Sequence, residues 1–428
     1  MSGLDQLYDA LANASAHRSP AAGKRLVTHA GGLAQPIAPT AAELSNDQVM
    51  AVLAERPDVE VLPVVKGDVP VGLLNRSAFL EAYAKPFARE VFGRRPCTTW
   101  MDASPVLVDA AMPLEALVER AVASGPKVLR DGFITTADGR YAGLGTGHAL
   151  MTAMSMLEAE KTRKLLESID YASMIQRSHL RASDAELAAA LPDHALAWEP
   201  RDVVGGDCYF FRRFDDGLFG AVLDCTGHGV PGAFMTLIAL SFLDHWVGSA
   251  SRDPGAALEA LNRHIKRVLG QDGRGAVPIA DPTRRSDDGL DGACFWLPSS
   301  RTQIAFAGAY LPLLVAAPGA TAAEVFSGER VSVGYDDTPP DQRWPARSIP
   351  LPPGALVAIA TDGLSDQVGG FKHIALGRKR LTEVLVASQG RPAPAVRDRI
   401  METLLAWQAG EPRRDDVTLL LFTAGGAA

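Results

Sequence analysis

The stretch GDCYFFRRFDDGLFGAVLDCTGHG, residues 206–229, decides how the second half of this chain folds. Its apolar run from Leu218 to Leu223 is typical of a strand, and the run ends directly at Asp224. Glycines stand beside Asp207 and in the turn after Asp224, where they let the backbone approach other groups closely. The pattern predicts carboxylates at strand ends that point into a shared cleft without being buried in the core.

Two further acidic turns downstream repeat this pattern. The apolar run from Leu356 to Ala360 ends just before Asp362, and the run from Val417 to Phe422 begins just after Asp415 and Asp416. Each turn alone is more typical of an ordinary strand-end turn than of a metal site. Together, however, converging carboxylates repel one another unless a cation lies among them. Oxygen ligands without a cysteine pattern favour Mg²⁺ or Mn²⁺ over zinc.

The sequence pattern from Ala195 onward indicates antiparallel sheets flanked by helices. Short predicted strands alternate there with Gly and Asp turns. Helices are expected over residues 232–247, 255–269, 378–387 and 395–408.

The composition indicates a globular protein of two or three domains in 428 residues. With 42 basic and 50 acidic residues the formal charge is -8, which argues against a protein that coats nucleic acid or an anionic membrane. The four cysteines show neither metal-ligand nor redox spacing, so a reducing cytoplasm is expected. Residues 1–20 show no secretory signal, and polar residues interrupt the apolar stretch 230–246, so no membrane span is expected.

The first third of the chain predicts an internal duplication. Residues 1–44 are expected to be a loose lead-in, because residues 21–44 are rich in Ala, Gly and Pro with little periodicity. The following domain, 45–150, contains a series of helix, strand, tight turn and strand twice.

These two passes resemble a tandem pair of CBS modules, carried by VEVLPVVKGDVPVGLLNRSAF (59–79) and DGFITTADGRYAGLGTGHAL (131–150). In that family a Thr or Ser and an Asp three residues later hold an adenosine nucleotide. The matching pairs in this chain are Asn75 with Ala78 and Thr146 with Ala149, so both ribose carboxylates are absent. The resemblance therefore favours a dimerisation module or a sensor of something else over nucleotide binding.

One long helix is predicted between these modules and the second half of the chain. Residues 150–180 contain no Gly or Pro, and their apolar residues recur mostly three or four apart between charged flanks. A helix of about 30 residues is too long to pack wholly on one small domain, so residues 151–182 are expected to be a connector that pairs with its own copy. The alternative is a helix that lies on the following domain, residues 190–425.

The second half resembles the metal-dependent PPM protein phosphatases, and within them the bacterial SpoIIE-like branch that acts on phosphoserine or phosphothreonine. The resemblance covers more than half of the chain, and IDYASMIQRSHL (169–180) is similar to the family's lead-in. It implies an α+β fold whose last domain is an α-β-β-α sandwich. The segments that carry it are EPRDVVGGDCYFF (199–211), VLDCTGHGVPGAFM (222–235), SDDGLDGACFWL (286–297), FAGAYLPLLV (306–315), IATDGLSDQVGG (359–370) and RRDDVTLLLF (413–422).

The resemblance also implies a set of ligands for two Mn²⁺ or Mg²⁺ ions. Asp207 and Asp224 would be ligands of this two-metal centre, with Asp224 bridging both ions and the backbone carbonyl of Cys225 contributing an oxygen. Asp362 and Asp415 would complete one ion's shell. The neighbouring Asp416 would orient Asp415. Such ions activate a water for in-line attack on phosphorus, without a phosphoenzyme.

Three features depart from the family pattern or stay open. Two extra residues separate Asp224 from His228, which favours a histidine at the start of a helix over a general acid. The turn at 308–310 lacks the Asp that holds a third metal in many members, so no third site of that kind is expected. The acidic residues Asp287, Asp288 and Asp291, and the basic residues Lys372, Arg378, Lys379 and Arg380, fit a solvated surface as well as a functional one.

These observations predict a cytoplasmic serine/threonine phosphatase that the first domain controls through the connector. A phosphorylated STAS-domain protein, similar to an anti-sigma-factor antagonist, is the substrate that the resemblance implies. The competing hypothesis is a signalling scaffold that uses the phosphatase fold only to bind a partner.

Overall fold

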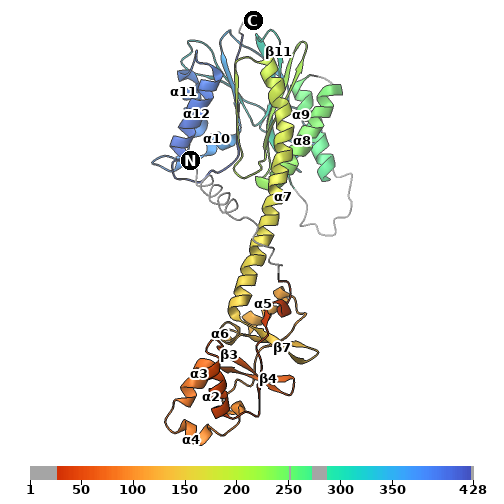
Figure 1. The fold of residues 1–428 in the computed structure, drawn as a ribbon. Coiled ribbons are helices and arrows are strands. Elements are labelled where there is room, and N and C mark those ends of the chain that lie inside the picture. The colour runs from red at the N-terminus through yellow and green to blue at the C-terminus, as the bar shows by residue number, and fades with distance from the viewer. Residues whose placement is uncertain (1–26, 250–251, 272–286, 426–428) are drawn as a thin grey trace. The chain divides into compact units, whose positions relative to one another are not determined.

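A computed structural model describes residues 27–249, 252–271 and 287–425 of the protein (Figure 1). By its internal contacts the chain divides into two compact units, Met1–Lys164 and Leu165–Ala428. The boundary falls inside one helix, α7 (Gly147–Ala190), so each unit is described by itself.

Unit 1 contains the same sequence of elements twice, as the sequence predicts. In each half the first two strands pair in parallel, the second and third pair antiparallel, and a register shift lies in the second strand. The first half is β2 (Thr40–Ala41), α2 (Asn46–Glu55), β3 (Val61–Lys66), β4 (Val69–Asn75) and α3 (Arg76–Tyr83). The second half is β5 (Leu107–Asp109), α5 (Leu114–Ala123), β6 (Phe133–Ala137), β7 (Arg140–Gly145) and then α7.

Equivalent side chains begin the last helix of each half. Asn75 accepts a hydrogen bond from the Ala78 N–H at the start of α3, and Thr146 accepts one from the Ala149 N–H at the start of α7. Both are N-cap contacts, which satisfy a free amide of the first helical turn. At these positions the two residues therefore have a structural role, and the likeness of unit 1 to a CBS pair stays a prediction.

The prediction of a loose lead-in is wrong for residues 27–44, while residues 1–26 lie outside the described part. The helix η1 (Ala30–Leu33) contributes Ala30 and Leu33 to a hydrophobic core, and β1 (Ala34–Gln35) pairs with β7. These segments have only two to four residues, too few to show a periodic pattern in sequence. Unit 1 is completed by α4 (Ala88–Phe92), η2 (Cys97–Thr99) and α6 (Lys127–Asp131).

The long helix α7 is confirmed, but it has 44 residues and ends at Ala190 rather than near residue 182. The first helix breaker after it is Pro192, which explains the later end. Leu180 and Leu187 on its second half belong to the main core of unit 2, so this part lies on the domain that follows. Pairing of two chains through α7 stays a prediction.

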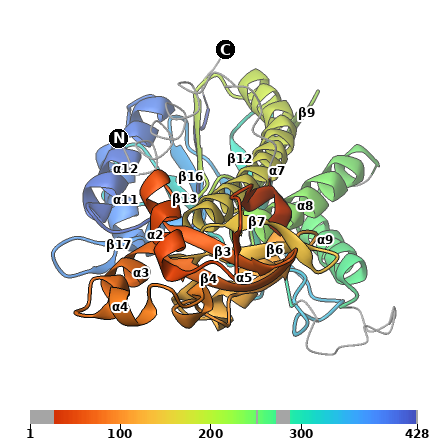
Figure 2. The same ribbon diagram turned by 60° about the horizontal axis from the view of Figure 1, so that its bottom comes forward.

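Unit 2 is a sandwich of two five-stranded antiparallel sheets. Figures 1 and 2 show α8 and α9 on one side of the unit and α11 and α12 on the other. The first sheet has the order β15 (Arg347–Pro350), β12 (Gln303–Ala309), β11 (Leu290–Pro298), β10 (Gly217–Cys225) and β9 (Asp207–Phe214). The second has the order β14 (Glu324–Phe326), β13 (Leu313–Ala316), β16 (Leu356–Ala360), β19 (Val417–Thr423) and β8 (His194–Glu199).

The helices of unit 2 cover the outer faces of the two sheets, which confirms the predicted α-β-β-α order. The first sheet carries α8 (Gly229–Ser249) and α9 (Pro254–Leu269), and the second carries α11 (Gly377–Ala387) and α12 (Ala393–Gln408). The main core lies between the sheets, where Phe295 of β11 stacks on Phe422 of β19 with ring centroids 6.2 Å apart. The remaining short elements are α10 (Asp362–Asp366), β17 (Val368–Gly369) and β18 (Ile374–Ala375).

By length and composition alone, α8 is the one helix in the described residues that could cross a membrane. This helix begins before and ends after the predicted helix 232–247, so its apolar stretch is longer than expected. Ala239, Leu243 and Val247 of this helix are buried in the main core of unit 2. A buried core helix gives the same signal, so this is weak evidence for a span.

Candidate metal centre

Three aspartates form a row across neighbouring strands of the first sheet. Asp224 on β10 stands opposite Asp207 on β9 and, on its other side, opposite Asp291 on β11. Residues opposite one another in antiparallel strands have side chains on the same face of the sheet. The row therefore brings together two predicted ligands and Asp291, whose role the sequence left open.

The second sheet brings two further predicted ligands to this row. Asp362 is the first residue of α10, two residues after β16, and Asp415 lies two residues before β19. Asp362 interacts electrostatically with Asp224, Asp415 and Asp291, and its carboxyl lies within hydrogen-bonding reach of that of Asp224. All four predicted carboxylates thus meet where the two sheets face each other.

Burial changes across the cluster, from the seam between the sheets to the solvent. Asp207 is only 1% exposed, whereas Asp224 and Asp291 are half-buried, and Asp362 and Asp415 are exposed. The prediction that the carboxylates avoid the core is therefore wrong for Asp207. The exposed members leave the cluster open on one side, as an active centre requires.

Two threonine hydroxyls replace water around the buried carboxylate. Oδ2 of Asp207 accepts hydrogen bonds from Thr361 Oγ1 at 2.7 Å and from Thr418 Oγ1 at 2.8 Å. Thr361 follows β16 and Thr418 lies on β19, so a carboxylate of the first sheet is held by the second. The sequence contains both threonines within the acidic turns, but nothing in a linear pattern shows that they point at Asp207.

Asp416 fastens the loop that precedes Asp207. Its carboxylate accepts hydrogen bonds from the Arg201 N–H at 2.6 Å and the Gly206 N–H at 2.5 Å. Its own N–H donates to Asp415 Oδ1 at 2.9 Å. Asp416 therefore contacts Asp415 through its backbone N–H, whereas its side chain positions the Gly206 turn.

The turn at Gly206 packs backbone against backbone beside Cys225. A Cβ on Gly206 would lie 2.3 Å from the Gly227 carbonyl oxygen and 2.7 Å from that of Cys225, which is far too close. The Cys225 N–H donates to the Gly206 carbonyl at 3.0 Å. The Cys225 carbonyl oxygen, a predicted ligand, therefore faces the residue next to Asp207, and only glycine permits that approach.

Five carboxylates at this site have a pKa above the ordinary value, namely Asp207, Asp224, Asp291, Asp362 and Asp416. Burial, with the nearby Asp416, raises the pKa of Asp207 from 3.8 to about 8. Burial and then Asp207 raise the pKa of Asp224 well above its ordinary value, and partial enclosure followed by Asp366 raises that of Asp362. Burial also raises the pKa of Asp291 and of Asp416.

The chemistry of this cluster fits a hard divalent cation. In the described part of the chain, no Lys, Arg or His forms an ion pair with any of these carboxylates. No group of three or more His, Cys, Asp or Glu side chains among the described residues already has the geometry of a metal site. The donors are nevertheless all oxygens, partly buried and mutually repulsive, and Mg²⁺ or Mn²⁺ would remove that repulsion.

His228 lies at the start of α8, as the sequence favours. Its Nδ1 is 2.7 Å from Asp202 Oδ2, and both side chains are about half exposed. Asp287, outside the row, accepts a hydrogen bond from the Asp336 N–H at 2.9 Å, which is a structural contact.

The comparisons with known proteins agree with this fold. Residues 215–424 match the family described as Stage II sporulation protein E (SpoIIE). Among solved structures, the SiaA-PP2C domain of Pseudomonas aeruginosa is 34% identical, covers 62% of this chain and 100% of its own, and has a TM-score of 0.54. No curated protein matches.

Two further solved structures match with lower identity. The RsbU and RsbW domains of a Mycobacterium tuberculosis protein are 22% identical, covering 56% of this chain and 62% of that one, with a TM-score of 0.43. The PP2C phosphatase domain of SpoIIE from Bacillus subtilis, with a fragment of its regulatory domain, is 14% identical, covering 55% and 64%, with a TM-score of 0.43.

The raised pKa values make the stability of the metal-free protein depend on pH. Since the folded-state pKa of Asp207 is raised from 3.8 to about 8, the unfolded chain loses its proton first as the pH rises. The free energy of unfolding should therefore fall between about pH 5 and about pH 8, by up to about 1.4 kcal/mol per pH unit for each such carboxyl. Urea unfolding of the metal-free protein across this range measures the slope.

Asp207→Asn should flatten this slope, and excess MnCl₂ should reverse the loss of stability in the wild type, because the cation binds the ionised form. Asp287→Asn, outside the cluster, should leave the slope unchanged. A metal-free protein whose stability rises over the same range contradicts the expectation.

Proposed function

Because this chain belongs to the SpoIIE family of PP2C-type protein phosphatases, we propose that it hydrolyses phosphoserine or phosphothreonine in a signalling protein. The family membership confirms the resemblance read from the sequence and supports a hydrolase. The observation that carries the proposal is the row Asp207, Asp224 and Asp291, which Asp362 and Asp415 join from the facing sheet.

Asp207, Asp224, Asp362, Asp415 and the Cys225 carbonyl are the groups proposed to hold two Mn²⁺ or Mg²⁺ ions. Such ions, when bound, provide an activated water near neutral pH and offset the charge of the phosphoryl oxygens. The protein's own residues fix the geometry. Thr361 and Thr418 orient Asp207, and Asp416 holds the Gly206 turn against the Cys225 turn.

A small pocket beside the cluster is the proposed site for the phosphorylated residue. It has a volume of about 200 Å³, and its lining includes the carboxylates Asp291, Asp362 and Asp366 together with Tyr310 and Arg378. The positive φ of Tyr310, 60°, brings this side chain to the pocket from the turn after β12. A carboxylate wall next to a single arginine suits a phosphate whose charge is shared between cations and a guanidinium.

The structure separates the basic residues that follow Asp362 in sequence. Arg380 stacks over Trp407, with its guanidinium 4.1 Å from the ring centroid, and donates to the Leu376 carbonyl. Lys379 pairs with Glu383 on the surface of α11. Arg378 alone among these residues lines the pocket, so we assign it to substrate binding rather than to a general basic patch.

The substrate proposed is a phosphorylated STAS-domain protein, on the resemblance to the SpoIIE-like branch. The alternative, a scaffold that binds a partner without catalysis, has the same fold but needs no intact carboxylate set. Asp207, Asp224, Asp362 and Asp415 are all present and converge, which favours the enzyme. A reducing cytoplasm is proposed because all four cysteines are buried and unpaired, although the thiols of Cys208 and Cys225 are within hydrogen-bonding reach.

Control of activity through α7 is supported by one buried side chain. Gln176, which is 1% exposed, donates to the Gly205 carbonyl at 2.7 Å and accepts from the Gly205 N–H at 3.2 Å. Gly205 precedes the turn that Asp416 fastens, two residues before Asp207. A shift of α7 would therefore act directly on the loop that positions a proposed ligand, which is the kind of two-state element that regulation requires.

Activity on p-nitrophenyl phosphate with MnCl₂ tests the enzyme against the scaffold. Asp224→Asn and Asp415→Asn should each lower kcat/KM by about 100-fold or more, since each removes a charged ligand from the centre. Asp287→Asn is the matched acidic control and should retain activity. Activity that survives both cluster variants refutes the metal mechanism.

Arg378→Gln should raise KM for a phosphoprotein substrate by about tenfold to a hundredfold while kcat changes little, because a charge-assisted contact of about 1.5–3 kcal/mol is lost. Lys379→Gln, on the next residue but outside the pocket, is the control. Equal effects of the two variants would mean that general surface charge, not the pocket, attracts the substrate.

Gln176→Ala should weaken Mn²⁺ binding about tenfold, because the loop before Asp207 loses its two buried hydrogen bonds. Calorimetric titration of MnCl₂ measures this without any substrate. Met174→Ala, an exposed position of α7, is the control. Unchanged Mn²⁺ affinity in Gln176→Ala would show that α7 does not support the centre.

A further inference from the structure

A second pocket lies at the other end of the strands that carry the metal centre. It has a volume of about 400 Å³, in the range of small-molecule sites, and is built by the end of α7, the β9–β10 turn and the β11–β12 turn. Its residue Phe214 is the last of β9, whereas Asp207 is the first. At about 3.3 Å per residue the two sites are about 23 Å apart, so this pocket takes no part in phosphate hydrolysis.

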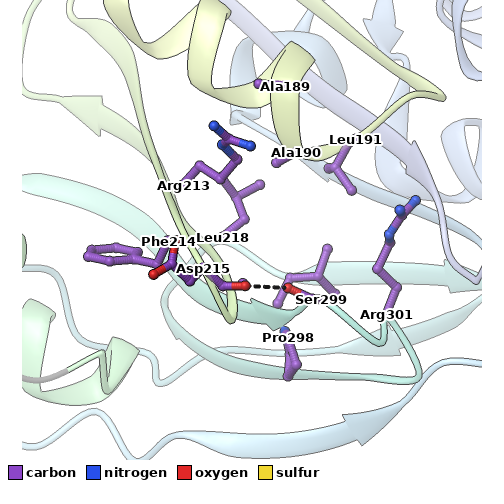
Figure 3. Close-up of a pocket in the computed structure, with 12 residues that line it drawn as sticks. Ala189, Ala190, Leu191, Arg213, Phe214, Asp215, Leu218, Pro298, Ser299 and Arg301 are labelled. Carbon is purple, nitrogen blue, oxygen red and sulfur yellow. Dashed lines mark hydrogen bonds between the residues drawn. The ribbon is translucent and has the colours of Figure 1, made fainter.

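Two arginines with free guanidinium groups line this pocket. In the described residues, neither Arg213 nor Arg301 has a side-chain hydrogen bond or ion pair, although the Arg213 backbone N–H donates to Glu186. Figure 3 shows the two side chains on opposite sides of the pocket, with Ala190 and Leu191 between them at the end of α7. Among the described residues, Asp215 is the one carboxylate in the lining, so the two arginines outnumber the acidic groups there.

The backbone of Arg301 adopts a conformation that favours glycine. Its φ is 50°, in the left-handed region, where a side chain with a Cβ costs about 1 kcal/mol or more. The side chain gains no hydrogen bond or ion pair within the described residues, and the turn itself is closed by its backbone N–H, which donates to Pro298. A half-buried arginine at such a position, with no side-chain partner among the described residues, is a candidate for contact with a ligand.

The remaining walls are apolar and firmly held. Leu191, Leu218 and Leu297 are each at most 2% exposed and belong to the main core. The Ser299 N–H donates to the Asp216 carbonyl at 2.9 Å, which ties the β11–β12 turn to the β9–β10 turn. Figure 3 also shows the Ser299 hydroxyl bonded to the Asp215 carbonyl, at 3.4 Å. The pocket is thus preformed, which reduces the entropic cost of binding.

We propose that this pocket binds a small organic anion, with its carboxylate or phosphate between Arg213 and Arg301 and its apolar part against the leucines. Guanidinium groups bind both kinds of anion through paired N–H donors. Because Ala190 and Leu191 belong to the wall, an occupied pocket fixes the last turn of α7 against the sandwich. A small molecule bound in this pocket therefore contacts α7, the helix whose Gln176 is hydrogen-bonded to Gly205.

Calorimetric titration of the metal-free full chain tests the site, since the absence of metal removes competition from the catalytic centre. The probes are phenylphosphonate and phenylacetate, which distinguish a phosphate from a carboxylate, and sulfate as an anion without an apolar part. At least one phenyl-bearing anion should bind tenfold or more tightly than sulfate. Equal binding of all three, or none, overturns the proposal.

Variants locate the binding. Arg213→Gln and Arg301→Gln should each weaken it at least tenfold, whereas Arg263→Gln, an exposed arginine of α9, should not change it. Arg301→Gly relieves the backbone at φ 50°, so its melting temperature should equal or exceed that of the wild type while anion binding is lost. Wild-type affinity in Arg301→Gly refutes the site without any question of misfolding.

Discussion

The burial of Asp207 between two sheets is the constraint on which the rest of unit 2 depends. A carboxylate that is 1% exposed needs hydrogen bonds and a compensating charge, because an isolated buried charge costs several kcal/mol. Thr361 and Thr418 of the facing sheet provide the hydrogen bonds, which fixes the distance and register between the sheets at this point. The threonines do not offset the negative charge of Asp207, which a bound cation would compensate.

The loops around Asp207 meet this constraint with backbone atoms more than with side chains. The Gly206 turn lies against the Cys225 and Gly227 carbonyls at a distance that no side chain permits, and Asp416 clamps the same turn from the opposite sheet. Gln176 adds a third attachment, from α7, to the neighbouring Gly205. Three elements that are distant in sequence therefore converge on two glycines, so a change in any one of them reaches the proposed metal centre.

The two ends of the sandwich differ in charge because acidic residues lie at the strand ends on one side and arginines on the other. At the Asp207 end, carboxylates gather without an ion pair to any basic residue of the described chain, which suits cations and, through them, phosphate. At the opposite end, the end of β9 carries Arg213 and the turn after β11 carries Arg301, which suits an organic anion directly. The helix α7 passes both regions, with Gln176 at the first and Ala190 at the second, so one helix contacts the surroundings of the proposed metal centre and the proposed anion site.

The sequence by itself determined the larger elements of the fold and the identity of the central carboxylates. Periodicity and strand-end turns located β16, the main helices and Asp207, Asp224, Asp362 and Asp415, because these signals are local. Tertiary structure alone decided that Asp207 is buried, that Thr361 and Thr418 bind it, and that Asp291 stands beside Asp224. The tertiary structure also decided that residues 27–44 add strands to unit 1. It decided that Arg378 lines a pocket while the neighbouring basic residues do not. These features depend on which strands and sheets become neighbours. A local sequence pattern indicates where a strand ends, but it does not indicate which strand lies beside it.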